Sequence, residues 1–118
     1  MMADLLTKDV EYSIVITTAA DRESAKSLAK LLVERRLAAR VQMFPIESVY
    51  LWQGKVCDGN EMVLFVKSKT TLFSKILAAI KENHAYEVPE VIQIPITDGL
   101  PEYLAWIGNS TLDEETRE

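Results

Sequence analysis

The sequence predicts one domain of the α+β class, in which helices pack against a β-sheet. Three observations support this prediction: apolar, β-branched runs recur along the chain, two stretches repeat apolar residues at helical spacing, and no low-complexity linker interrupts them. The chain has 118 residues, 48% of them hydrophobic, which is enough for one core. We therefore assign residues 1–118 to a single domain, with a loose leader at 1–10 and an acidic tail at 113–118.

The first third of the chain predicts a strand, a helix and another strand. Residues Tyr12–Thr18 are β-branched and apolar, as in a strand. Asp21 suits the N-cap of a helix that ends near Arg36 or Leu37, because its carboxylate can accept hydrogen bonds from free amides of the first turn. The buried stripe of this helix follows the spacing i, i+3, i+4, i+7: Ala25, Leu28, Ala29 and Leu32. We expect the next strand at Ala39–Phe44, stopped by Pro45, which has no N–H to donate.

The middle of the chain predicts a hairpin and a central strand. Residues Ser48–Trp52 and Lys55–Cys57 flank Gln53-Gly54, a dipeptide that suits a hairpin turn. Asp58-Gly59 predicts a second turn. The segment Glu61–Lys67 is apolar between its charged ends, which indicates a strand buried on both faces at the centre of the sheet.

The last third predicts two helices separated by a strand. Ser68 or Thr70 can cap the first of them, which ends near His84. Its apolar stripe is Phe73, Ile76, Leu77 and Ile80. Val91–Ile96 is the next strand, and Pro95 places it at an edge or a bulge. A proline at residue 101 suits the first turn of a short last helix, whose apolar residues are Tyr103, Leu104, Trp106 and Ile107.

The order of these elements predicts a ferredoxin-like split βαβ plan, βαββαβ with a short C-terminal helix. In this plan an antiparallel sheet carries both long helices on one face. The other face of such apolar strands needs a cover, and the chain has no further long helix to supply it. We therefore expect another subunit to cover it.

Composition limits the possible functions. The formal net charge is −5 and no basic stripe is present, so a nucleic-acid partner is not expected. No apolar run reaches the roughly 20 residues of a membrane helix, and the start lacks the features of a signal peptide, so we expect a cytoplasmic protein with no membrane contact. No nucleophile elbow, phosphate loop or zinc-protease motif is present, which favours a protein that is not an enzyme.

A few side chains could carry chemistry. His84 is the only histidine, and Glu87 and Glu90 follow it closely, so the three could bind copper or another divalent cation. His84 could instead cap the second helix, where an imidazolium meets the last carbonyls. Cys57 is the only cysteine, so no intrachain disulfide can form. It could be a metal ligand or a reactive thiol, but we expect a small buried hydrophobe. Glu61 and Lys67 point to one face of their strand about 20 Å apart, too far to pair with each other.

Several motifs occur in a specific order across roughly residues 12–110. They are Thr17-Thr18, Glu34-x-x-Leu37-Ala38-Ala39, Pro45-x-x-Ser48-x-Tyr50-x-Trp52-x-Gly54-Lys55, Glu61, Lys67, His84-x-Tyr86-Glu87-x-Pro89-Glu90 and Tyr103-x-x-Trp106. In this order the chain resembles the CutA family of divalent-cation tolerance proteins. The resemblance implies an interlocked homotrimer in which the hairpin of each subunit reaches a neighbour. It also implies a role in divalent metal (copper) tolerance or binding and in the response to metal ions. No cofactor is expected to be needed for folding.

The resemblance also implies an intersubunit cleft. Its residues would be Tyr50, Trp52, Glu61, Lys67, Tyr86 and Trp106. Aromatic side chains with a few charges suit either a small-ligand pocket or a subunit interface, and for Tyr50 and Trp52 we favour the interface.

Two departures from the family pattern bear on function. Arg40 stands where the family usually has cysteine, which removes a soft copper ligand, and Ala85 stands where it usually has proline. Two alternatives therefore stay open: a small-ligand-sensing signalling trimer similar in architecture to the nitrogen-regulatory family, and a purely structural trimer.

Overall fold

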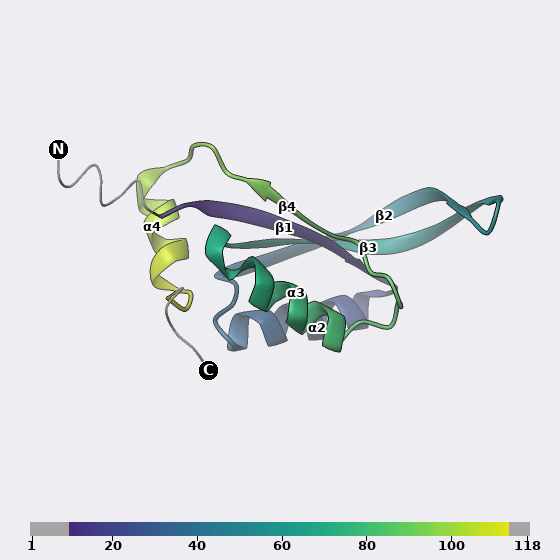
Figure 1. Cartoon of the computed structure of the whole chain (residues 1–118), viewed down its shortest axis with the longest axis horizontal. Helices are drawn as coiled ribbons and strands as arrows, with labels where there is room; N and C mark the ends of the chain where they lie inside the picture. Colours follow the sequence, from purple (N-terminus) through teal and green to yellow (C-terminus); the bar gives the residue numbers. More distant parts are fainter. Residues whose placement is uncertain (1–9, 114–118) are drawn as a thin grey trace.

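Within residues 10–113, which the computed structural model describes, four antiparallel strands form one sheet. The elements in chain order are β1 (Tyr12–Ala19), α2 (Arg22–Glu34), β2 (Arg40–Trp52), β3 (Lys55–Lys69), a 3-10 turn (Thr70–Leu72), α3 (Phe73–Glu82), β4 (Val91–Pro95) and α4 (Pro101–Asn109). The strand order is β2-β3-β1-β4, so β3 and β1 are central (Figure 1). The predicted central position of Glu61–Lys67 is confirmed, but the predicted burial on both faces is not seen in the single chain, where Phe65 and Lys67 are only half-buried. The expected leader and acidic tail fall largely on residues 1–9 and 114–118, which lie outside the described residues.

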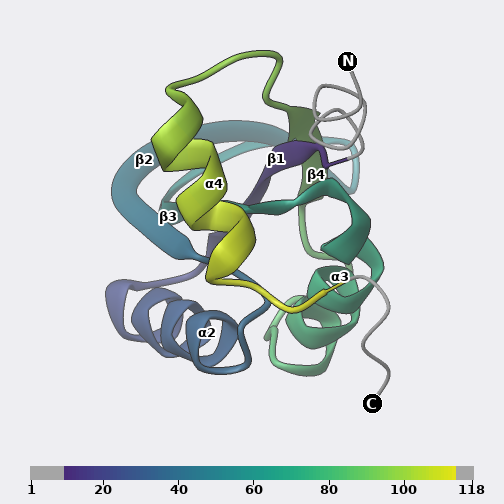
Figure 2. The same cartoon turned by 90° about the vertical axis from the view of Figure 1, so that its left-hand side faces the viewer.

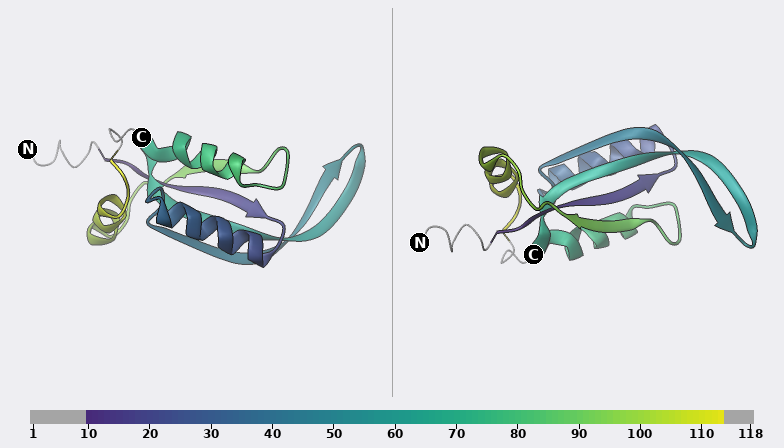
Figure 3. Two further views of the ribbon diagram at one scale, coloured as in Figure 1. Left: turned by 90° about the horizontal axis from the view of Figure 1, so that it is seen from below. Right: turned by 90° about the horizontal axis from the view of Figure 1, so that it is seen from above.

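Helices α2 and α3 cover the same face of the sheet, as Figures 1 and 3 show. Each of them connects two strands that run in the same direction and have another strand between them: β1 with β2, and β3 with β4. The third helix, α4, crosses the end of the sheet where β1 begins (Figure 2). This leaves most of the second sheet face uncovered, and we call it the open face.

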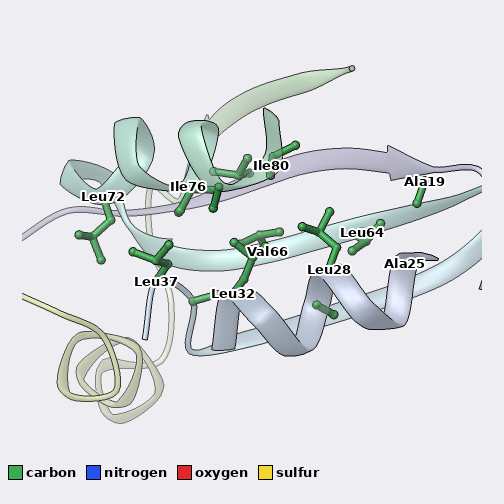
Figure 4. Packing of buried hydrophobic residues seen from close by; sticks show 14 residues of the cluster. Ala19, Ala25, Leu28, Leu32, Leu37, Leu64, Val66, Leu72, Ile76 and Ile80 are labelled. Atoms are coloured by element: carbon green, nitrogen blue, oxygen red, sulfur yellow. The ribbon is translucent and has the colours of Figure 1, made fainter. Parts of the chain in front are cut away.

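The core lies between the sheet and the two long helices (Figure 4). The predicted stripe of α2 is confirmed, because all four of its residues are buried. The stripe of α3 is confirmed in part: Ile76 and Ile80 are fully buried, but Leu77 is only half-buried and Ala79 is buried instead. Leu32 and Ile76 face Leu64 and Val66 of β3. Residues with even numbers on β3 therefore face the helices, and those with odd numbers, such as Phe65, face the open side.

The open face is apolar over several strands. In the cross-strand register Ile16 on β1 lies beside Phe65 on β3 and Ile92 on β4. Three large side chains remain well exposed there: Phe44 (44%), Ile92 (48%) and Ile94 (44%). A sheet face of this composition is usually covered in the working form of a protein.

Strands β2 and β3 continue beyond the rest of the sheet as a two-stranded ribbon, residues 47–60, which we call the arm (Figures 1 and 3). It turns at Gln53 and Gly54, both with positive φ (51° and 78°), the combination that a tight hairpin turn requires. The predicted Gln53-Gly54 turn is confirmed. The arm makes the chain elongated, with extents of 55 × 28 × 22 Å.

Two predicted interruptions are wrong, because strand pairing continues through them. Pro45 lies inside β2, opposite Met62, instead of ending the strand. Since β2 is an edge strand, one side of its backbone has no partner strand, and the missing N–H can lie on that side. Asp58-Gly59 lies inside β3 with Gly59 opposite Ser48, and its backbone is extended through the predicted turn.

The helix ends are partly as predicted. Asp21 caps α2, with its Oδ1 accepting a 2.8 Å hydrogen bond from the Ser24 amide, which confirms the predicted N-cap. This bond holds the pKa of the Asp21 carboxyl below its usual value. The helix ends at Glu34, and Arg36 follows with a left-handed φ of 59°. The Arg36 guanidinium then donates to the carbonyl of Asn109 at 3.1 Å, which anchors the end of α4.

The predicted cap of the second helix is wrong. The helix α3 begins after a 3-10 turn with Leu72 at its N-cap, and no side chain caps it. The hydroxyl of Ser68 instead donates to the carbonyl of Leu37 at 2.6 Å. The hydroxyl of Thr70 shares a hydrogen bond with that of Ser13 on β1. Both candidates therefore hold tertiary contacts instead of the helix end.

Candidate functional site

Polar side chains gather at two places on the open face, and the first is centred on Glu61. This residue lies on β3 where the sheet passes into the arm, opposite Ile46 on β2. Its Oε1 accepts a 3.0 Å hydrogen bond from the Ser48 hydroxyl, and its Oε2 accepts a 3.1 Å bond from the phenol of Tyr86. Both oxygens of the carboxylate are therefore engaged. We call Glu61, Ser48, Tyr86 and the adjacent His84 the distal cluster.

His84 is held through both nitrogens of its ring. Its Nδ1 accepts a 3.0 Å hydrogen bond from the Tyr86 amide, and its Nε2 bonds to the carbonyl of Thr18 at the end of β1. An amide can only donate and a carbonyl can only accept, so the ring is the neutral tautomer with its proton on Nε2. The alternative role as a cap of α3 is not supported, because Asn83 fills it by donating to the carbonyl of Ala79 at 2.8 Å.

Tyr86 contacts both His84 and Glu61. The rings of His84 and Tyr86 are 4.7 Å apart and tilted by 55°. Burial raises the pKa of the Tyr86 phenol above its ordinary 10.0, and the hydrogen bond to Glu61 and the negative charge of Glu61 raise it further. The Tyr86 hydroxyl is therefore a donor over the working pH range, which suits it to hold a carboxylate in place.

The predicted metal ligands do not form a metal site within one chain. Glu87 and Glu90 are exposed on the loop that precedes β4. In residues 10–113 no group of three His, Cys, Asp or Glu side chains is placed to hold a metal ion. A cation would reach His84 only by displacing Thr18 or the Tyr86 amide. A metal site at His84, Glu87 and Glu90 stays a prediction, one that would need groups from another chain or a rearrangement of this loop.

The second group of polar side chains lies at the other end of the open face, beneath α4. Arg40 on β2 is directly opposite Lys67 on β3. The Arg40 guanidinium carbon lies 5.6 Å from the ring centre of Trp106, and the Lys67 ammonium lies 5.6 Å from that of Tyr103. The two rings are themselves 5.6 Å apart. We call these four residues the proximal cluster.

The predicted cleft residues are thus divided among three places in one chain. Glu61 and Tyr86 meet in the distal cluster, whereas Lys67 and Trp106 belong to the proximal cluster. Tyr50 and Trp52 lie on the arm, exposed by 49% and 62%. Glu61 and Lys67 have different partners, as their separation along one strand predicted.

Sequence reasoning did not identify three residues of these clusters as site residues, Ser48, Arg40 and Tyr103, nor Thr18, whose carbonyl bonds to His84. Ser48 and Tyr103 are part of the motifs that carry the resemblance, but the motifs do not give their partners. Arg40 was visible only as a departure from the family pattern. The register that sets it opposite Lys67 is the signal that was missing.

Cys57 belongs to neither cluster. It lies on the arm opposite Tyr50 and is partly exposed, so the prediction that it is buried is wrong. Its thiol makes a long 3.8 Å contact with the carbonyl of Lys55. The arm has only two strands and no layer against it, so no core is available there for this side chain.

A groove of about 800 Å³ lies at the end of the sheet near α4, and no residue of either cluster lines it. Tyr12, Pro95 and Leu104 are among its lining residues, and none of the predicted site residues line it. In the described part of the chain no helix is long and apolar enough to cross a membrane.

Comparison with known proteins connects this arrangement to one family. The family described as "CutA1 divalent ion tolerance protein" matches residues 13–110. "Divalent-cation tolerance protein CutA" of Thermus thermophilus is 42% identical over 99 residues, which cover 83% of this chain and 96% of that protein. "Protein CutA, chloroplastic" of Arabidopsis thaliana is 43% identical over 106 residues, 89% of this chain. The chain spans only 58% of the length of that plant relative.

Solved structures agree with this assignment. The crystal structure of CutA1 from Oryza sativa superposes with a TM-score of 0.86 at 41% identity, covering 88% of this chain and 96% of that one. A "periplasmic divalent cation tolerance protein CutA" from Archaeoglobus fulgidus gives 0.83 at 36% identity, covering 84% and 97%. These names include chloroplastic and periplasmic proteins, so the expected cytoplasmic location stays a prediction. By sequence and by fold, the chain belongs to the CutA1 divalent ion tolerance protein family.

Proposed function

We propose that this chain works as a homotrimer of the ferredoxin-like plan in the tolerance of divalent metal ions, copper among them, without catalysing a reaction. The observation that carries the assembly is the apolar open face, on which Phe44, Ile92 and Ile94 remain 44–48% exposed in the single chain. The strand order β2-β3-β1-β4, with helices between β1 and β2 and between β3 and β4, supports the ferredoxin-like plan.

The arm supports an interlocked assembly over a simple face-to-face contact. It extends past the end of the four-stranded sheet and carries exposed Tyr50 and Trp52, and both residue types are enriched at subunit interfaces. In a closed ring of three, each arm would reach the open face of a neighbour. The distal cluster lies at the root of the arm, so such packing would enclose Glu61 and Tyr86 in an intersubunit cleft.

The metal part of the proposal rests on family membership and on the chemistry of the distal cluster. His84 is the only imidazole, and Tyr86 links it to a carboxylate: the Tyr86 amide donates to His84 and the Tyr86 hydroxyl donates to Glu61. Because both ring nitrogens are already engaged, a cation bound at His84 must replace one of those hydrogen bonds. We therefore expect reversible binding of modest affinity, completed by carboxylates such as Glu87 and Glu90 or by a neighbouring chain.

Native mass spectrometry with and without one equivalent of Cu(II) or Zn(II) tests both parts. A trimer should appear near 40 kDa, three times the 13.3 kDa of one chain. We expect copper uptake by the trimer and its loss in His84→Ala. The matched variant is His84→Gln, which can still donate to Thr18 but has no imidazole, and it should also lose copper. A monomer would contradict the assembly, whereas a trimer that takes up neither metal would contradict the metal role alone.

A further inference from the structure

Two cations, Arg40 and Lys67, lie side by side on the open face, and no acidic side chain among the described residues pairs with them. Arg40 and Lys67 are directly opposite each other in the register of β2 and β3, and like charges in such a pair repel. Among residues 10–113 neither has a carboxylate within 4.0 Å, whereas Arg35 pairs with Glu82 and Lys69 with Asp113. The chain as a whole carries a net charge of −5, so two adjacent cations with no carboxylate partner in the described residues are a local exception.

Aromatic rings hold the two cations at one place. Trp106 attracts the guanidinium of Arg40 and Tyr103 attracts the ammonium of Lys67, each at 5.6 Å from the ring centre. Because the rings come from successive turns of α4 and are 5.6 Å apart, the charged groups are kept near each other instead of dispersing into solvent. The aromatic contacts thus oppose the separation that charge repulsion favours.

The proximal cluster also contains a buried hydroxyl with no partner among the described residues. The hydroxyl of Tyr103 is buried and has no hydrogen-bond partner in the described part of the chain. Most buried polar atoms in folded proteins have a partner, so this hydroxyl indicates that the cluster is incomplete in the single chain. A group that supplies negative charge and acceptor oxygens would complete it.

We propose that Arg40 and Lys67 form a binding site for a carboxylate. The guanidinium offers two parallel N–H donors to the two oxygens of a carboxylate, and the ammonium adds a point charge beside them. Arg40 is exposed and Lys67 is half-buried, so the site can be reached from the open face. The carboxylate has two possible sources: an Asp or Glu side chain of a second copy of this chain, or a free small carboxylic acid. The inference rests on the proposed trimer for the first source only, and it is independent of metal binding.

The variants Arg40→Gln, Arg40→Lys and Lys67→Gln test this site, with Arg35→Gln as the matched control. Arg35 is also an exposed arginine, and it lies 3.9 Å from Glu82 on the other side of the sheet. Two measurements are needed for each variant. The first is the dissociation midpoint, the protein concentration at which half of the assembly has dissociated, measured by mass photometry at low and at high salt. The second is the thermal midpoint, the midpoint temperature of thermal unfolding in succinate or citrate, compared with sodium chloride or phosphate at equal ionic strength.

A free carboxylic acid as the ligand predicts that succinate or citrate raises the thermal midpoint of the unaltered protein and not that of Arg40→Gln or Lys67→Gln. A carboxylate of a second copy predicts instead that these variants raise the dissociation midpoint by about ten-fold or more and weaken its salt dependence. Arg40→Lys keeps the charge without the paired donors and should fall between. Stabilisation by phosphate alone, or variants that match Arg35→Gln in both measurements, would overturn the carboxylate site. A monomeric unaltered protein would refute the trimer and still leave the succinate measurement decisive.

Discussion

Replacing Ile92 by alanine tests whether the open face is a subunit interface. Ile92 lies on β4, beside Ile16 of β1, and 48% of its surface is exposed in the single chain. Fully burying an isoleucine contributes about 1.5–3 kcal/mol, so the exposed half can contribute roughly 1 kcal/mol to an interface. Three copies give about 3 kcal/mol per trimer, which weakens trimer association by roughly 100-fold at 1.4 kcal/mol for each factor of ten.

Val33 supplies the matched control. It is 41% exposed on α2, in the layer on the opposite side of the sheet, so Val33→Ala removes a similar exposed apolar surface from a face that we do not place in the interface. Sedimentation equilibrium over a wide concentration range should show Ile92→Ala dissociating at higher protein concentration than both Val33→Ala and the unaltered protein. The reasoning is refuted if the two variants shift the dissociation equally, or if Ile92→Ala does not shift it.

Two further predictions concern single contacts. Replacing a helical glycine by alanine usually raises the free energy of unfolding by about 1 kcal/mol. Gly108→Ala should not do so, because the new Cβ would lie 2.9 Å from the Tyr12 hydroxyl oxygen. In a Tyr12→Phe background, which lacks this oxygen, urea unfolding should show the usual increase. Glu61→Gln should lower the Tyr86 pKa, because it removes the negative charge, while burial keeps that pKa above 10.0. Because the folded-state pKa is raised, the neutral Tyr86 phenol contributes its full stabilisation below pH 10.0. This stabilisation is lost as the pH rises through the folded-state pKa. Since Glu61→Gln lowers that pKa, the variant should begin to lose the stabilisation at a lower pH. Phenolate absorbance against a Tyr86→Phe reference measures this shift, and an unchanged or higher pKa would contradict it.

Local patterns predicted the elements of the fold because the core is built from them. The stripes of α2 and α3 repeat at the helical period, and residues such as Leu32 and Ile76 are completely buried. The patterns failed where pairing between strands decided the conformation. An Asp-Gly dipeptide favours a turn in isolation, yet at Asp58 the chain stays extended because β3 pairs with β2 over the whole length from Arg40 to Trp52.

The site was less predictable than the fold, because its contacts join residues far apart in the chain. Tyr86 was named as a cleft residue, but its bond to Glu61 spans 25 positions and depends on how the loop after α3 returns to the sheet. Arg40 and Lys67 became neighbours only through the register of β2 and β3. Composition and spacing identify the residue types of a site, whereas the register and the loop path decide which of them meet.

The arm gives the strongest physical reason to expect interlocked subunits. A two-stranded ribbon is marginally stable by itself in water, yet this one exposes apolar groups on both faces. Val49 (74%) and Leu51 (71%) lie on one face, and Tyr50 and Trp52 lie on the other. A partner that packed flat against the open face would cover only the side that carries Tyr50 and Trp52. Covering Val49 and Leu51 as well requires that the arm be inserted between surfaces, which an interlocked ring provides and a flat contact does not.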